Sequence, residues 1–178
     1  MDLETSLLER VTQMFDDRDI SRETAWYYEE RAKKAIANLE KYNVIAHYVP
    51  TQKEAIPVIM GMIPEGVTVA RSDSVTIEQI GFLHELKKRN KNEFIDPFTR
   101  DNDGQLLTGT EEEFTRLLKE ALLAEVYLTG TNAVTLDGKL INIDGRGNRV
   151  AAHIYGPNKV IFVTGANKKD VHLANVNP

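Results

Sequence analysis

Short apolar segments that suit β-strands alternate along this chain with longer amphipathic segments that suit α-helices. Strands are expected at residues 44–49, 67–70, 94–97, 126–129 and 160–164. Helices are expected at residues 51–63, 75–89 and 110–122, where apolar side chains recur every three or four positions, with a short one from about residue 148. Strands joined by helices of this length pair in parallel, because each crossover returns the chain to the same end of the sheet. The pattern therefore predicts an α/β fold with a largely parallel sheet flanked by helices.

Two further features complete the expected architecture. A β-hairpin is predicted near the end of the chain, turning at Asp137 and Gly138. The first 42 residues carry two apolar helical stripes separated by a charged turn at residues 16–19, which predicts N-terminal helices. No linker, repeat or low-complexity stretch divides the sequence. Residues 1–178 are therefore expected to form a single α/β domain, with residues 1–42 packed on it as a helical extension.

The composition excludes several classes of function. The chain has no Cys among its 178 residues, which excludes disulfides, thiolate nucleophiles and Cys-ligated zinc or iron–sulfur clusters. Redox chemistry would therefore need a partner or a diffusible cofactor, and the identity of any cofactor stays open. The four histidines are scattered without metal-ligand spacing, so no metal site is expected. A net charge of -5 argues against nucleic acid or an anionic membrane as the main partner.

The N-terminal residues give no sign of export. Residues 1–10 are acidic and amphipathic, unlike the basic start and apolar core of a signal peptide. No stretch reaches the roughly 18 apolar residues of a membrane span. A cytoplasmic location is therefore expected.

Candidate ligand-binding residues follow the predicted strands. In open α/β sheets, ligands bind beyond the carboxyl ends of the strands, and three polar segments are expected there. The first follows the 67–70 strand and carries the hydroxyl groups of Ser72, Ser74 and Thr76. Capping of the next helix is the simpler explanation of these hydroxyls when they are considered by themselves, and ligand binding is the alternative.

The second segment follows the 126–129 strand. Gly130 would let the backbone approach a ligand closely, and the amide of Asn132 can both donate and accept hydrogen bonds. Thr131 lies between them. An ordinary turn is the alternative, because glycine and asparagine are common turn residues.

The third segment, residues 142–151, combines glycines with amide and cationic side chains. Gly145 and Gly147 permit positive φ angles, Asn148 is a natural N-cap, and Arg146 and Arg149 bring positive charge to a helix start. This combination suits a carboxylate or phosphate anion. The third glycine of a dinucleotide fingerprint is missing, and no Gly-Lys-Ser/Thr ending marks a phosphate-binding loop. A structural turn with arginine salt bridges explains the local sequence equally well.

Two carboxylates near these segments could transfer protons. Asp144 ranks first as a general acid or base, because Asp137 suits the hairpin turn better. Glu78 and Glu125 are carboxylates that could serve a different reaction.

Residues 129–151, TGTNAVTLDGKLINIDGRGNRVA, resemble the signature of the LUD-domain family, the lactate-utilisation proteins. Residues 72–81, with their hydroxyl cluster, and residues 160–168 also resemble the family, and the likeness extends from about residue 29 to 169. The resemblance implies a fold similar to CoA transferases, sugar-phosphate isomerases and formyltetrahydrofolate cyclo-ligases. Members of the family take part in bacterial oxidation of lactate to pyruvate. Some are fused to iron–sulfur modules, whereas a chain without Cys matches those that stand alone.

The resemblance implies a function in lactate oxidation, with a small anionic metabolite bound between the three segments. The expected partners are an iron–sulfur or flavin redox subunit and a second copy of the chain. Whether the chain is catalytic by itself stays open. One alternative is an enzyme of the related fold that acts on a CoA thioester, a sugar phosphate or a folate. Another is a non-enzymatic subunit that docks onto an iron–sulfur or flavin complex.

Overall fold

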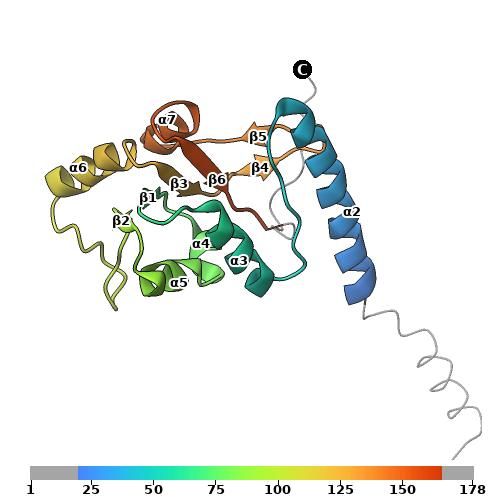
Figure 1. Ribbon diagram of the computed structural model, residues 1–178, viewed down its shortest axis with the longest axis horizontal. Helices are drawn as coiled ribbons and strands as arrows, with labels where there is room; N and C mark the ends of the chain where they lie inside the picture. The colour runs from blue at the N-terminus through green and yellow to red at the C-terminus, as the bar shows by residue number, and fades with distance from the viewer. Residues whose placement is uncertain (1–19, 166–178) are drawn as a thin grey trace, which may run out of the picture.

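The computed structural model describes residues 20–165, which form a parallel sheet flanked by helices (Figure 1). The helices are α2 (Ser21–Leu39), the 3-10 helix η1 (Glu40–Tyr42), α3 (Gln52–Met62), α4 (Val75–Gln79), α5 (Phe82–Arg89), α6 (Glu111–Ala121) and α7 (Asn148–Ile154). The strands are β1 (Thr68–Arg71), β2 (Glu93–Ile95), β3 (Val126–Thr129), β4 (Ala133–Val134), β5 (Leu140–Ile141) and β6 (Lys159–Phe162). The main sheet has the order β2-β1-β3-β6, and every neighbouring pair in it is parallel. The predicted α/β class is therefore confirmed.

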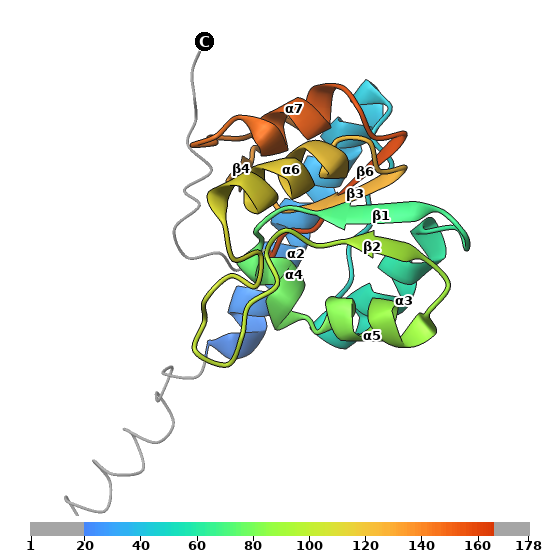
Figure 2. The same ribbon diagram turned by 90° about the vertical axis from the view of Figure 1, so that its left-hand side faces the viewer.

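Both faces of the main sheet are covered by helices (Figure 2). Successive strand residues point to opposite faces. Val69, Val126 and Leu128 pack in one cluster with side chains from α3, α4 and α5. On the other face, Ala70 and Tyr127 pack against α6 and α7. Burying an aliphatic side chain of this size contributes about 1.5–3 kcal/mol to folding, so these two clusters hold the strand ends in place.

The predicted hairpin is present as the antiparallel pair β4–β5, and α2 packs against its turn. The Asn38 amide of α2 donates to the Leu136 carbonyl oxygen at 2.7 Å. Gly138 has a φ of +85°, and a Cβ at this position would lie 2.8 Å from the Asn38 carbonyl carbon. A glycine is therefore required where α2 and the hairpin meet. Helix α2 confirms part of the expected helical extension, whereas residues 1–19 of that extension lie outside the described residues.

The predicted strand at residues 44–49 is wrong. This segment runs without a strand partner, none of its residues is buried, and Ile45 is 84% exposed. Alternation of apolar residues favours a strand only where a neighbouring strand and a covering layer are available. The segment instead serves as the connection from η1 to α3.

The prediction of one continuous helix at residues 75–89 is also wrong. It is divided into α4 and α5 by Gly81, which has a left-handed φ of 74°. Glycine adopts this conformation without the steric cost that other residues incur, and the chain changes direction there.

In the described residues 20–165, no helix has the length and apolar character needed to cross a membrane.

Candidate functional site

A cavity of about 490 Å³ lies beyond the carboxyl ends of the parallel strands. It borders the loop that follows β1, the loop that follows β3 and the segment that precedes α7. The ends of parallel strands meet at one edge of the sheet, and this edge is where ligands bind in open α/β folds. The structure thus brings the three predicted segments to one place.

Most of the predicted site residues line this cavity. Those that do are Ser72, Ser74, Gly130, Thr131, Asn132, Asp144, Gly145, Asn148 and Arg149. Two predicted residues do not line it. Thr76 lies within α4, and Gly147 precedes α7 with a left-handed φ of 82°.

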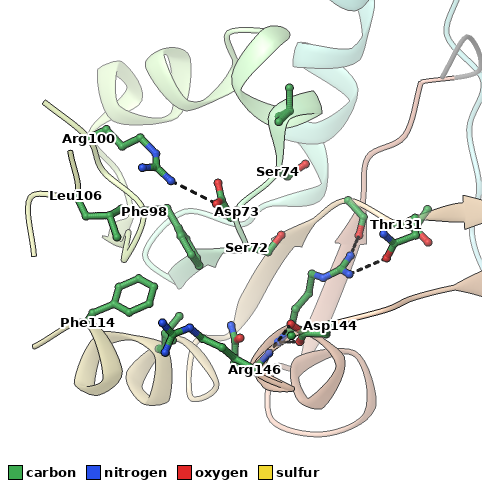
Figure 3. Close-up of a pocket in the computed structure, with 17 residues that line it drawn as sticks. Ser72, Asp73, Ser74, Phe98, Arg100, Leu106, Phe114, Thr131, Asp144 and Arg146 are labelled. Atoms are coloured by element: carbon green, nitrogen blue, oxygen red, sulfur yellow. Dashed lines mark hydrogen bonds and ion pairs between the residues drawn. The ribbon is translucent and has the colours of Figure 1, made fainter. Parts of the chain in front are cut away.

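The sequence interpretation missed a wall of apolar and charged side chains. It is made by Asp73, Val75, Phe98, Arg100, Leu106, Phe114, Leu118 and Arg146, of which only Arg146 had been considered as a group that could face an anion. Figure 3 shows Leu106, Phe98 and Phe114 on one side of the space, opposite Thr131 and Asp144. The rule that ligands bind at strand ends also applies to β2, and it would have pointed to Phe98, which follows that strand closely.

The Arg149 guanidinium connects three parts of the site. Its Nη1 donates to the Gly130 carbonyl oxygen at 3.3 Å and to Asn142 Oδ1 at 3.2 Å. Its Nη2 donates to Asn132 Oδ1 at 2.8 Å and to the Ile143 carbonyl oxygen at 2.6 Å. All four acceptors are uncharged, so within the described residues no direct ion pair neutralises Arg149. The group therefore fixes the loop geometry and still presents positive charge to the cavity.

Asp144 accepts hydrogen bonds at the start of α7. Its Oδ2 accepts from the backbone N–H groups of Arg149 at 2.8 Å and Val150 at 3.2 Å, and its Oδ1 accepts from Arg146 N–H at 3.3 Å. The prediction that Asn148 caps this helix is wrong. Gly147 occupies the N-cap position, and glycine has no side chain that could accept a hydrogen bond there. Asp144 supplies the negative charge instead.

These contacts change the ionisation of Asp144. Partial burial raises its pKa, but the three backbone donors and the charge of Arg149 outweigh burial and hold the pKa below its ordinary value. Asp144 is therefore a carboxylate at neutral pH. A proton-transfer role for it stays a prediction.

Replacing Asp144 by asparagine is expected to lower the free energy of unfolding by about 0.3–1 kcal/mol near neutral pH, because the amide keeps one acceptor oxygen but loses the negative charge at the start of the helix. Because the folded-state pKa is lowered, the contribution of the carboxylate is present above the unfolded pKa of about 3.9 and is lost as pH falls through the folded pKa. Urea unfolding of both proteins at neutral and acidic pH measures this. A stability difference that persists unchanged in acid would contradict the capping role.

A chain of buried hydroxyl groups leads from the cavity to a histidine. The Thr129 hydroxyl donates to the Gly130 carbonyl oxygen at 3.0 Å, so its single hydrogen is used there. The Ser72 hydroxyl then donates to Thr129 Oγ1 at 3.0 Å, and His153 Nε2 lies 3.2 Å from the same oxygen. Burial lowers the pKa of His153, as does the charge of Arg149, which outweighs the opposing effect of Asp144. Ser72 is left with free lone pairs for a donor in the cavity.

Gly130 allows close packing between two site loops. A Cβ at this position would lie 2.9 Å from Ser74 Oγ, which is the side chain that caps α4. The sequence interpretation expected Gly130 to let backbone approach a ligand. In the structure it lets the loop after β1 approach the loop after β3, and the two loops close the base of the cavity.

Several polar groups in the cavity have no protein partner. The side chain of Asn148 makes no hydrogen bond to any residue within 20–165, and Asn132 uses only its Oδ1, toward Ile143 N–H and Arg149. A Cβ at Gly145 would meet no atom within 4 Å, and Gly145 does not have a left-handed φ. Two amide groups and an open backbone position are thus available to a ligand.

A buried arginine, Arg71, lies beside Phe98 of the cavity wall. Arg71 at the end of β1 is 2% exposed, and its Nε donates to Asp96 Oδ1 at 2.6 Å, while its Nη1 donates to Glu78 Oε1 at 2.8 Å. Its guanidinium also lies 5.7 Å from the centre of the Phe98 ring. Asp96 Oδ1 in turn accepts from the Phe98 N–H at 3.1 Å. Arg71 therefore holds the segment after β2 in its position at the cavity.

These features define an α/β protein with a parallel sheet and a polar cavity at its carboxyl edge. The LUD domain model matches residues 32–168, which is more than half of the chain, and the chain belongs to the LUD-domain family. Comparison with curated proteins gives no match. Comparison with solved structures gives none either.

Proposed function

We propose that this protein binds a small carboxylate in the cavity and acts in the oxidation of lactate to pyruvate, together with an iron–sulfur or flavin redox subunit. Family membership supports the lactate-utilisation setting. The observation that carries the binding proposal is Arg149, a guanidinium that faces the cavity with only uncharged acceptors around it. Because its four Nη hydrogens are already donated to protein acceptors, Arg149 would act on a carboxylate there chiefly through electrostatic attraction.

The other groups of the cavity fit a 2-hydroxy acid. The free amide nitrogens of Asn132 and Asn148 can donate to carboxylate oxygens. The Ser72 oxygen, whose hydrogen is engaged by Thr129, can accept a hydrogen bond from a substrate hydroxyl. Oxidation of that hydroxyl to a ketone releases two electrons and two protons. We assign the two electrons and the carbon-bound hydrogen's proton to the redox subunit, and propose Asp144, an ionised carboxylate in the cavity, as the acceptor of the hydroxyl proton.

Calorimetric titration with lactate and pyruvate tests the binding proposal. Arg149→Gln is expected to weaken binding more than tenfold, because the neutral amide cannot attract the carboxylate. Since this change also removes hydrogen bonds between loops, Gly145→Ala provides a second variant. It has room for a methyl group and should keep the stability of the wild type while weakening binding. A ligand at 100 times its dissociation constant should stabilise the fold by about 2.7 kcal/mol, which a thermal denaturation check can detect.

Arg116→Gln is the matched control for the loss of one positive charge. Arg116 lies exposed on α6, pairs with Glu113 and Glu120, and does not line the cavity. Its replacement should leave the affinity unchanged. If the Arg149→Gln protein is folded and binds as tightly as the wild type, the proposed site is wrong. Lactate oxidation by the isolated chain would contradict the need for a redox subunit.

A second candidate function is supported by the size of the cavity. At about 490 Å³ it could also hold part of a CoA thioester, a sugar phosphate or a folate, as in enzymes of the related folds. Titration with these compounds beside lactate distinguishes the two functions. A third candidate, a docking subunit without its own chemistry, is supported by the aromatic side chains of α2. Trp26 is 65% and Tyr27 50% exposed.

A further inference from the structure

The cavity is much larger than lactate. A three-carbon hydroxy acid fills about 180 Å³ at most, if each non-hydrogen atom takes the roughly 30 Å³ of a liquid water molecule. The cavity measures about 490 Å³. Lactate alone would therefore leave most of the space to water.

One side of the cavity contains a cluster of apolar side chains. Phe98, Phe114 and Leu118 form a buried cluster with Leu106 packed against it, and all four line the cavity. The two phenyl rings pack edge to face, with their centres 5.6 Å apart. Figure 3 shows these rings and Leu106 facing the polar side formed by Thr131 and Asp144. The single methyl group of lactate is too small to cover this wall.

The other cations of the cavity are already neutralised. Arg100 forms an ion pair with Asp73 at 3.5 Å, and Arg146 forms one with Glu111 at 2.6 Å. The Arg146 guanidinium also lies over the Phe114 ring, 5.2 Å from its centre. These two arginines therefore border the apolar wall as charged groups that already have carboxylate partners. Within residues 20–165, Arg149 is the cation of the cavity lining without a direct ion pair, and the ionised Asp144 lies in the same cavity. This charge balance suits a ligand with one anionic group better than one with several phosphates.

We infer that the cavity selects a monocarboxylate with an apolar or aromatic group about the size of a phenyl ring, such as an aryl-substituted 2-hydroxy acid. This inference rests on the proposed function, since it places the carboxylate at Arg149 and the hydroxyl at Ser72. The added group lies against Phe98, Leu106 and Phe114. Burial of that group, which has no counterpart in lactate, supplies the preference.

Calorimetric titration with the matched pair lactate and phenyllactate tests the inference. Phenyllactate has the same carboxylate and hydroxyl, so a difference in affinity reports on the ring alone. Burying a ring of this size is expected to tighten binding about tenfold or more. Phenyl phosphate and coenzyme A complete the series and represent ligands with more negative charge.

Two neighbouring leucines provide a matched pair of variants. Leu106→Asn places a polar group in the wall and should remove most of the preference for phenyllactate over lactate. Leu107→Asn is the control, because Leu107 is 61% exposed and does not line the cavity. It should behave as the wild type does. Thermal denaturation of both variants checks that they are folded.

The outcomes separate this inference from the proposed function. Equal affinity for lactate and phenyllactate would overturn the inference and leave the proposed function in place. Failure of the folded wild type to bind any carboxylate of the pair would overturn both. A preference for phenyllactate that Leu106→Asn does not reduce would place the ring elsewhere and overturn the inference. Tighter binding of phenyl phosphate or coenzyme A would also overturn it, in favour of the second candidate function.

Discussion

Replacement of Arg71 by methionine is expected to lower the free energy of unfolding by about 3–5 kcal/mol, the usual cost of removing one partner from a buried ion pair. The methionine can fill part of the space, but it leaves the buried carboxylate of Asp96 without its closest cation. The partly exposed Glu78 can turn to water, so Asp96 dominates the cost. Urea unfolding measures the change.

The effect on the cavity should accompany the effect on stability. Arg71 is connected through Asp96 to the Phe98 backbone, so its loss should disturb the apolar wall as well. Arg116→Met on the exposed face of α6 is the control, because its two ion pairs are open to solvent and should contribute far less. Equal destabilisation by the two replacements would contradict the prediction that the buried ion pairs of Arg71 contribute more to stability than the exposed ion pairs of Arg116. The double variant Arg71→Met and Asp96→Asn should regain part of the lost stability.

Replacement of Gly156 by alanine is expected to destabilise the protein by about 2–5 kcal/mol, since two costs add. Gly156 has a φ of +122°, which side chains disfavour. A Cβ there would also lie 2.3 Å from the Leu122 carbonyl oxygen, at the end of α6. Backbone on both sides of the contact must then move. Thermal or urea denaturation detects the loss.

A glycine without these constraints provides the comparison. Gly61 lies inside α3, has no atom within 4 Å of an added Cβ and does not have a left-handed φ. Gly61→Ala should stabilise the protein by about 0.5–1 kcal/mol, because alanine loses less conformational freedom in a helix. If Gly156→Ala is as well tolerated as Gly61→Ala, the close packing of α6 against the turn before β6 is wrong.

The fold was predictable where each segment carried its own signal. Strand β3 was predicted to the residue, because four successive buried positions lie between clear boundaries. Helix α6 was predicted within residues 110–122, and in the structure the Thr110 side chain caps it by accepting from Glu113 N–H. The segment 44–49 has the same kind of apolar pattern but no neighbouring strand. Whether a neighbouring strand is available depends on how the whole chain folds, so a local sequence pattern cannot predict it.

The candidate site was predictable in its location and less so in its details. Three loops were expected together, because parallel strands end at one edge of the sheet. Phe98, Leu106 and Phe114 come from three separate segments and meet only through tertiary packing, so no spacing in the sequence marks them. The cap of α7 was assigned to Asn148, the nearest polar residue. Gly147 turns the backbone so that Asp144, which lies earlier in the chain, reaches the helix instead.

The shape of the cavity depends on several segments that are all hydrogen-bonded to Arg149. One side chain from α7 holds the loop after β3 and the segment after β5, through acceptors on Gly130, Asn132, Asn142 and Ile143. None of these segments can open without breaking a bond to the same guanidinium. The group that we propose as the ligand-binding cation is thus also the group that connects the segments around the cavity. A substitution at Arg149 would therefore alter the charge of the cavity and the positions of its loops at once.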